Sequence, residues 1–324
     1  MKQIKRIVLL FLFTAAVTGI LFAAGGSEKD SKGVIVFGDV SWDSVKVHNR
    51  IAGFIIDHGY GYTPEYTPGE TITIYQGMMQ GDIDVNMESW SDNVQEAYDK
   101  GIKSGTIIDL GPNFPDSEQG WYIPTYMIKG DAKRGIKATA PDLTSVEMLP
   151  KYWELFKDPE APSKGRLFVG PPGWGATEFG QEKMVKLGLD KTYNAFLPGS
   201  DAALSGSMIA AYKKGEPWLG YYWAPTWVLG SLDMTLLKGS EWPPAKVNIL
   251  INPSVKEKAP ELVDFFTKYE TTTPENNEFL AIMKDKDYTT DEAAMWFLKN
   301  KENKWSKWVP KDVHEKVKKA LASL

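Results

Sequence analysis

Short apolar runs bounded by glycine alternate with segments of helical period along most of the chain, and this alternation limits the possible folds more than any other feature. Residues 34–37 are an apolar run between Gly33 and Gly38, which is typical of a buried strand, and apolar residues at helical spacing follow over 47–55. Residues 166–169 and 178–187 repeat this order. Near the C-terminus, Thr289 and Glu292 form the pattern of a helix capping box. The repeated order predicts an α/β chain with mainly parallel sheets.

One pattern occurs twice. Residues 78–82 and residues 212–216 each combine the end of a helix, a glycine and an acidic turn, and each leads through a strand to a tryptophan, Trp90 or Trp223. Two similar α/β units would place both tryptophans beyond the carboxyl ends of strands, where such sheets bind ligands. The alternative is a coincidence between two common turns.

The first 26 residues have the order of a secretory signal peptide. Lys2, Lys5 and Arg6 precede an apolar run over 7–21, and small residues follow over 23–26. The run is shorter than the roughly 20 residues of a membrane span. We therefore expect a periplasmic protein, with an uncleaved membrane anchor as the alternative.

Several classes of site lack the residues that they need. The chain contains no Cys, which excludes disulfides, thiolate metal sites and a lipid-modified cysteine anchor. The three His residues are scattered, so neither a metal site nor a Ser-His-Asp triad is expected, and the chain is predicted not to be an enzyme and to use no cofactor. A net charge of -5 argues against a nucleic-acid partner.

The 12 tryptophans are the most unusual part of the composition, and some of them stand beside features of a binding site. Because strand residues alternate faces, Glu88 and Trp90 share one side of their strand. Residues 170–177 (Gly-Pro-Pro-Gly-Trp-Gly-Ala-Thr) follow a strand and open a helix. The amides of Gly175 and Ala176 would face outward at that helix N-terminus, which attracts carboxylates.

A cage of tryptophan rings can bind a quaternary ammonium group without a counter-ion, because the ring faces attract cations. Trp223 stands at the tip of an aromatic strand that Pro225 ends. Together with a helix N-terminus, such a cage suits a zwitterion that carries a methylated ammonium and a carboxylate. The alternatives are core packing of the same rings and stacking on a sugar.

Five short motifs, in order, resemble the glycine betaine, choline and proline-betaine substrate-binding proteins of ABC importers over residues 34–324. The motifs cover residues 40–44, 81–90, 120–124, 172–175 and 222–227. This resemblance implies a two-lobed periplasmic-binding-protein fold of type II, with residues 33–125 and 245–324 in lobe 1 and residues 126–244 in lobe 2. It also implies a monomer that delivers its ligand to an ABC permease.

The resemblance further implies roles for individual residues. Trp90 would come from one lobe, Trp174 and Trp223 from the other, and the amides of Gly175 and Ala176 would take a carboxylate. Choline-binding relatives have aromatic residues at the positions of Trp42 and Trp121, so these two are candidate lining residues.

The chain also departs from its relatives. Choline-binding relatives have an Asp at the position of Ser44 and an Asn at that of Trp174, which favours a betaine-type ligand here. Some betaine binders have a His at the position of Val94. Glu88 would favour a cation if ionised and would donate to an N-oxide if protonated. Choline, carnitine and trimethylamine N-oxide therefore stay open as ligands, as does a sensory ectodomain of the same fold.

Overall fold

The computed structural model describes residues 31–242 and 245–324, which belong to one compact unit. The signal peptide expected over 1–26 lies outside these residues. No helix in the described part of the chain is long and apolar enough to cross a membrane.

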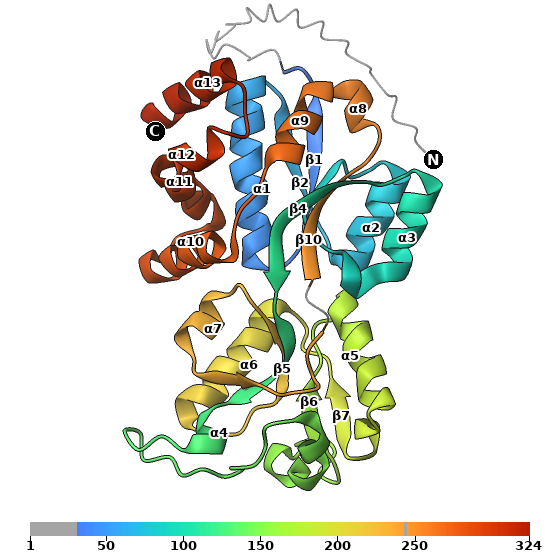
Figure 1. The fold of residues 1–324 in the computed structure, drawn as a ribbon, viewed down its shortest axis with the longest axis vertical. Helices are drawn as coiled ribbons and strands as arrows, with labels where there is room; N and C mark the ends of the chain where they lie inside the picture. The colour runs from blue at the N-terminus through green and yellow to red at the C-terminus, as the bar shows by residue number, and fades with distance from the viewer. Residues whose placement is uncertain (1–30, 243–244) are drawn as a thin grey trace, which may run out of the picture. The chain divides into compact units, whose positions relative to one another are not determined.

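The first sheet contains five strands of the described chain in the order β2-β1-β3-β10-β4 (Figure 1). β1 pairs in parallel with β2 and β3, whereas β10 is antiparallel to both of its neighbours. The strands are β1 (Val34–Asp39), β2 (Thr63–Pro68), β3 (Val85–Trp90), β4 (Ile108–Ser117) and β10 (Ala245–Ile251).

Helices cover this sheet, with α2 and α3 on one side of the view and α1 with α10, α11, α12 and α13 on the other (Figure 1). The capping box predicted at Thr289 and Glu292 is confirmed at the start of α11. The helices are α1 (Asp43–Ile55), α2 (Thr71–Gln80), α3 (Gln95–Ser104), α8 (Val255–Lys258), α9 (Pro260–Lys268), α10 (Thr273–Lys286), α11 (Thr290–Asn300), α12 (Glu302–Trp305) and α13 (Lys311–Ala322).

The second sheet contains five strands of the described chain in the order β7-β6-β8-β5-β9. β6 pairs in parallel with β7 and β8, and β5 is antiparallel to both β8 and β9. The strands are β5 (Gln119–Pro124), β6 (Gly165–Phe168), β7 (Tyr193–Phe196), β8 (Gly220–Trp223) and β9 (Met234–Leu236), and the helices are α4 (Tyr126–Lys129), α5 (Gly175–Lys186), α6 (Asp201–Lys214) and α7 (Trp227–Ser231).

The two sheets have the same order of strands, which confirms the repeat predicted from the sequence. In the first sheet, β1 lies between β2 and β3, to which it is parallel, and the antiparallel strand β10 follows β3. In the second sheet, β6 lies between β7 and β8, to which it is parallel, and the antiparallel strand β5 follows β8. β3 and β8 therefore occupy equivalent places in the two sheets, and they end at Trp90 and Trp223. Two sheets flanked by helices confirm the α/β prediction, although each sheet is mixed, with two parallel and two antiparallel pairings among the described strands.

Strand β5 lies in the second sheet, although sequence analysis placed residues 33–125 in the first lobe. Gln119 to Tyr122 pair with Trp223 to Gly220 of β8. The aromatic residues of both strands are buried there, so this pairing removes more apolar surface from water than an exposed crossing would. The chain therefore crosses between the sheets directly after β4.

Candidate functional site

Four tryptophans line a narrow cavity of about 20 Å³ between the two sheets. Each is between 3% and 6% exposed, so the rings are almost fully withdrawn from water. Three further side chains and the start of α5 complete the wall. The lining residues are Trp42, Thr71, Trp90, Asn93, Trp174, Gly175, Ala176, Tyr221 and Trp223.

The four tryptophans occupy equivalent places in the two sheets. Trp90 and Trp223 are the last residues of β3 and β8. Trp42 and Trp174 are the N-cap residues of α1 and α5, the helices that follow the first parallel strand of each sheet. Carboxyl ends of strands and N-termini of the following helices meet at one edge of an α/β sheet, which brings each pair together.

Neighbouring rings stand almost at right angles. The Trp174 ring lies with its centroid 5.4 Å from that of Trp42 and 5.2 Å from that of Trp223, with interplanar angles of 82° in both cases. Rings at right angles are arranged like adjacent walls of a box. The rings of Trp42, Trp174 and Trp223 therefore form one continuous aromatic part of the cavity wall.

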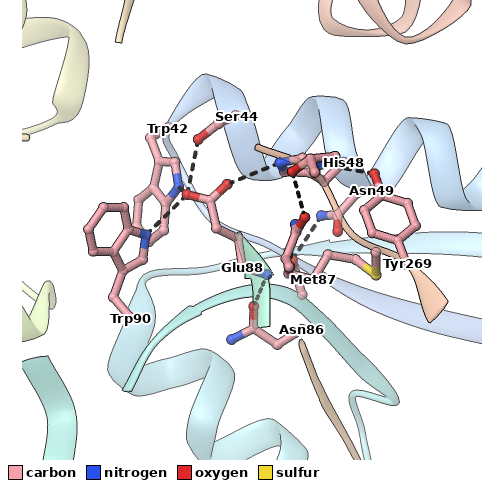
Figure 2. A network of polar contacts seen from close by, with 12 residues as sticks. Trp42, Ser44, His48, Asn49, Asn86, Met87, Glu88, Trp90 and Tyr269 are labelled. Atoms are coloured by element: carbon pink, nitrogen blue, oxygen red, sulfur yellow. Dashed lines mark hydrogen bonds and ion pairs between the residues drawn. The ribbon is translucent and has the colours of Figure 1, made fainter. Parts of the chain in front are cut away.

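Glu88 lies behind the cage and does not line the cavity (Figure 2). Its side chain is 1% exposed, and its Oε1 accepts hydrogen bonds from Trp42 Nε1 at 2.7 Å, from Trp90 Nε1 at 3.0 Å and from Ser44 Oγ at 3.0 Å. One carboxylate oxygen thus accepts a hydrogen bond from each of two cavity-lining indole rings, Trp42 and Trp90. Hydrogen bonds to an ionised acceptor are about twice as strong as neutral ones, so this contact fixes both rings firmly.

Burial raises the pKa of Glu88 to about 7, and the three hydrogen bonds oppose this rise. His48 lies on the far side, with Nε2 4.0 Å from Glu88 Oε2 and Nδ1 2.9 Å from the Tyr269 hydroxyl (Figure 2). Burial lowers the pKa of His48 to about 3, so its imidazole is neutral. Neither Glu88 Oε2 nor His48 Nε2 has a hydrogen-bond partner among the described residues. The charge of this site near neutral pH therefore depends on the proton of Glu88.

The N-terminus of α5 faces the same cavity. Gly175 and Ala176 are its first two residues, and both line the cavity. The N–H groups in the first turn of a helix have no intrahelical acceptor, and the helix dipole makes this end positive. The first turn of α5 therefore stands in the cavity wall beside the tryptophans, and its role in binding an anion stays a prediction.

Trp121 is not in the cavity wall. It is fully buried, and its ring packs edge to face on Trp242 at a centroid distance of 6.1 Å. Tyr221, its partner in the pairing of β5 with β8, lines the cavity instead. A second cavity shares Trp42 and Trp223 with the first and contains Trp227.

Sequence reasoning missed three lining residues, Thr71, Asn93 and Tyr221. Tyr221 could have been found, because it is two residues before Trp223 on one strand and so points to the same face. Asn93 exchanges two hydrogen bonds with Gln119, at 3.0 and 3.1 Å, and Gln119 lies in the second sheet. No pattern within either segment indicates that pairing.

Residues 33–300 match the family model described as the substrate binding domain of the ABC-type glycine betaine transport system. Among solved structures, the chain is 18% identical to the glycine betaine, L-proline-binding protein (ProX) of Borrelia burgdorferi, with a TM-score of 0.75 over 88% of this chain and 99% of that one. It is 18% identical to lactococcal OpuAC complexed with glycine betaine, with a TM-score of 0.72 over 86% of this chain and 100% of that one.

A third similar structure is an ABC-transporter choline binding protein in complex with choline. Its identity to this chain is 17% and its TM-score 0.75, over 89% of this chain and 98% of that one. At these identities the likeness concerns the fold, and with the order of the two sheets it confirms the type II periplasmic-binding-protein architecture.

Proposed function

The chain belongs to the family of substrate-binding domains of ABC-type glycine betaine transport systems, and on that premise we propose that its four-tryptophan cavity holds the methylated ammonium group of the ligand. The observation that carries the proposal is the meeting of Trp42 and Trp90 from the first sheet with Trp174 and Trp223 from the second. A cation between such faces gains about 0.5–2 kcal/mol per ring, depending on its desolvation.

A ligand with a carboxylate gains a second contact from α5. The amides of Gly175 and Ala176 stand in the same wall as Trp174, so a short zwitterion reaches both sites at once. Glycine betaine has this structure, and a protein of this fold has been solved in complex with it. We therefore propose glycine betaine or a similar betaine as the ligand, with choline, carnitine and trimethylamine N-oxide as the alternatives.

The cage discriminates by the cost of desolvation. A primary ammonium loses strong hydrogen bonds to water, and ring faces return none of them. A trimethylammonium group has no N–H hydrogen bonds to lose on leaving water, and its positive charge is attracted by the ring faces. Glu88, when ionised, adds a negative charge directly behind Trp42 and Trp90, which favours cations further.

We further propose that each sheet forms the core of one lobe, and that closure of the lobes brings the two pairs of tryptophans together around the ligand. The closed protein then docks on the membrane permease. We also propose that residues 1–26 direct export and that the mature protein acts in the periplasm, with an uncleaved membrane anchor as the alternative.

Calorimetric titration tests the proposal. Glycine betaine, proline betaine, choline, carnitine and trimethylamine N-oxide are titrated into the protein, with glycine and a disaccharide as controls. We expect at least one methylated amine to bind, and glycine, which has the carboxylate but no methyl groups, to bind far more weakly. Binding of the disaccharide alone contradicts the proposal.

A further inference from the structure

The N–H group of Trp174 is bound by a carboxylate from the opposite sheet. Trp174 Nε1 donates to Glu70 Oε2 at 2.6 Å, and the same oxygen accepts from Ser41 Oγ at 3.1 Å. Glu70 is the N-cap residue of α2, beside the first sheet, whereas Trp174 is the N-cap residue of α5, beside the second. This single bond therefore connects a wall of the cavity to the other half of the molecule.

The backbone on either side of Trp174 contacts the first half as well. Ile72 N–H, in the first turn of α2, donates to the Gly173 carbonyl at 3.3 Å. Gly173 has φ +85°, and a Cβ atom there would lie 3.0 Å from Glu70 Cβ. Side chains disfavour that backbone conformation, and the close approach leaves little room for one.

Gly175 approaches the first half closely too. A Cβ atom on Gly175 would overlap Val94 Cγ1 and the Asn93 carbonyl oxygen. Residues 173–175 thus fit between the start of α2 and the turn at 93–94 because two glycines leave the space. We call this set of contacts, made by residues 173–175 with Glu70, Ile72, Asn93 and Val94, the clasp.

We propose that Glu70 is a positioning residue that orients the Trp174 ring only when the two halves of the molecule are in contact. The inference rests on the proposed function, in which Trp174 is a wall of the cage. Two ring contacts, to Trp42 and Trp223, fix the position of the Trp174 ring, and the N–H bond to Glu70 fixes its rotation. The carboxylate also places negative charge at the ring edge, which strengthens the attraction of the ring face for a cation.

The order of events follows from this geometry. A ligand that enters while the halves are apart meets Trp174 without its Glu70 contact. The contact forms on closure and must break before the ligand leaves. Loss of Glu70 should therefore raise the dissociation rate constant and leave the association rate constant almost unchanged.

A double-mutant cycle between Glu70 and Trp174 tests the inference. The variants are Glu70→Ala, Trp174→Phe, which keeps an aromatic ring but has no N–H, and the double variant. Glu70→Gln keeps an acceptor oxygen, and Glu65→Ala removes an exposed carboxylate of β2 as a matched control. The probe is glycine betaine, or choline if the wild type binds choline more tightly, in calorimetry and stopped-flow fluorescence.

We expect Glu70→Ala to weaken binding about 10-fold or more, since it removes a hydrogen bond to a charged acceptor. The loss should lie in the dissociation rate, and Glu70→Gln should recover most of the affinity. In the Trp174→Phe background, Glu70→Ala should change affinity little. Circular dichroism and thermal unfolding establish that each variant is folded.

Equal effects of Glu70→Ala in both backgrounds, or wild-type dissociation kinetics in Glu70→Ala, overturn the inference and leave the proposed function intact. A wild-type protein that binds no methylated amine overturns both. If Glu70→Ala fails to fold, Glu70→Leu, which also has no acceptor atom, takes its place in the cycle, and its coupling to Trp174→Phe must then be present for the inference to stand.

Discussion

The buried carboxyl group of Glu88 should make the stability of the protein depend on pH in a defined direction. Its pKa rises from an ordinary value of 4.5 to about 7 in the folded protein. Between these two values the unfolded chain has lost the proton that the folded chain still holds. Stability contributed at this position is therefore fully present below pH 4.5 and declines as the pH rises toward 7.

The size of the effect follows from the shift. At about 1.4 kcal/mol per pKa unit, a rise from 4.5 to about 7 lowers the free energy of unfolding by about 3 kcal/mol once the group is ionised. Glu88→Gln keeps the shape and an acceptor oxygen for Trp42 and Trp90 but has no proton to lose. Asp201, whose pKa burial also raises to about 7, titrates in both proteins and cancels in the difference.

Urea unfolding at pH about 5 and about 8, followed by far-UV circular dichroism, measures this difference. We expect the wild type to lose about 2.5 kcal/mol more than Glu88→Gln over that interval, and Glu65→Gln, which changes an exposed carboxylate, to follow the wild type. In the same interval the wild-type affinity for choline should rise with pH, because ionised Glu88 stands behind two cage rings. Parallel stability curves for wild type and Glu88→Gln would refute the reasoning.

Substitutions at four other positions separate the roles of the remaining residues. Trp90→Ala and Trp223→Ala should each weaken binding of a methylated amine by at least about 1 kcal/mol in calorimetry, and wild-type affinity in both would place the cage elsewhere. Trp121→Ala should instead lower the free energy of unfolding by about 3–5 kcal/mol in urea titration, because its ring is fully buried away from the cavity, while Trp121→Phe should bind ligand nearly as the wild type does. Gly175→Ala should weaken binding about 10-fold or more, because its methyl group overlaps Val94 across the clasp. The melting temperature of this variant should change much less than its affinity. An unchanged dissociation constant would show that the overlap relaxes freely.

Local patterns were sufficient to predict the elements and their repetition. The apolar runs, the glycine turns and the capping box at Thr289 depend on residues close together in sequence, so periodicity and composition reveal them. The equivalence of Trp90 and Trp223 was also visible, because each follows the same short order of helix, glycine, acidic turn and strand. The order of strands in both sheets confirms that prediction.

Contacts between distant segments were beyond this reasoning. Glu70 and Trp174 are separated by 104 positions, and nothing beside Glu70 marks it as an acceptor for an indole. Trp121 was a candidate lining residue because choline-binding relatives have an aromatic residue at its position, yet in this structure β5 pairs with β8 and the Trp121 ring packs on Trp242. The sequence correctly predicted that Glu88 lies beside Trp90. Its contact with a second indole N–H group could not be predicted, because the position of Trp42 depends on a different strand and helix.

If the proposed site is correct, the equivalent placement of two tryptophans on each sheet means that each half of the molecule carries half of the binding site. The Trp42 and Trp90 rings share one oxygen of Glu88, and the Trp174 and Trp223 rings are in edge-to-face contact, so each pair has a contact of its own within its half. Joined by two chain crossings, the pairs act as the two arms of a chelator, and the overall affinity depends on the effective concentration of one arm at the other. Substitutions at the crossings between the sheets can therefore tune how tightly the solute is held without altering any residue that touches it.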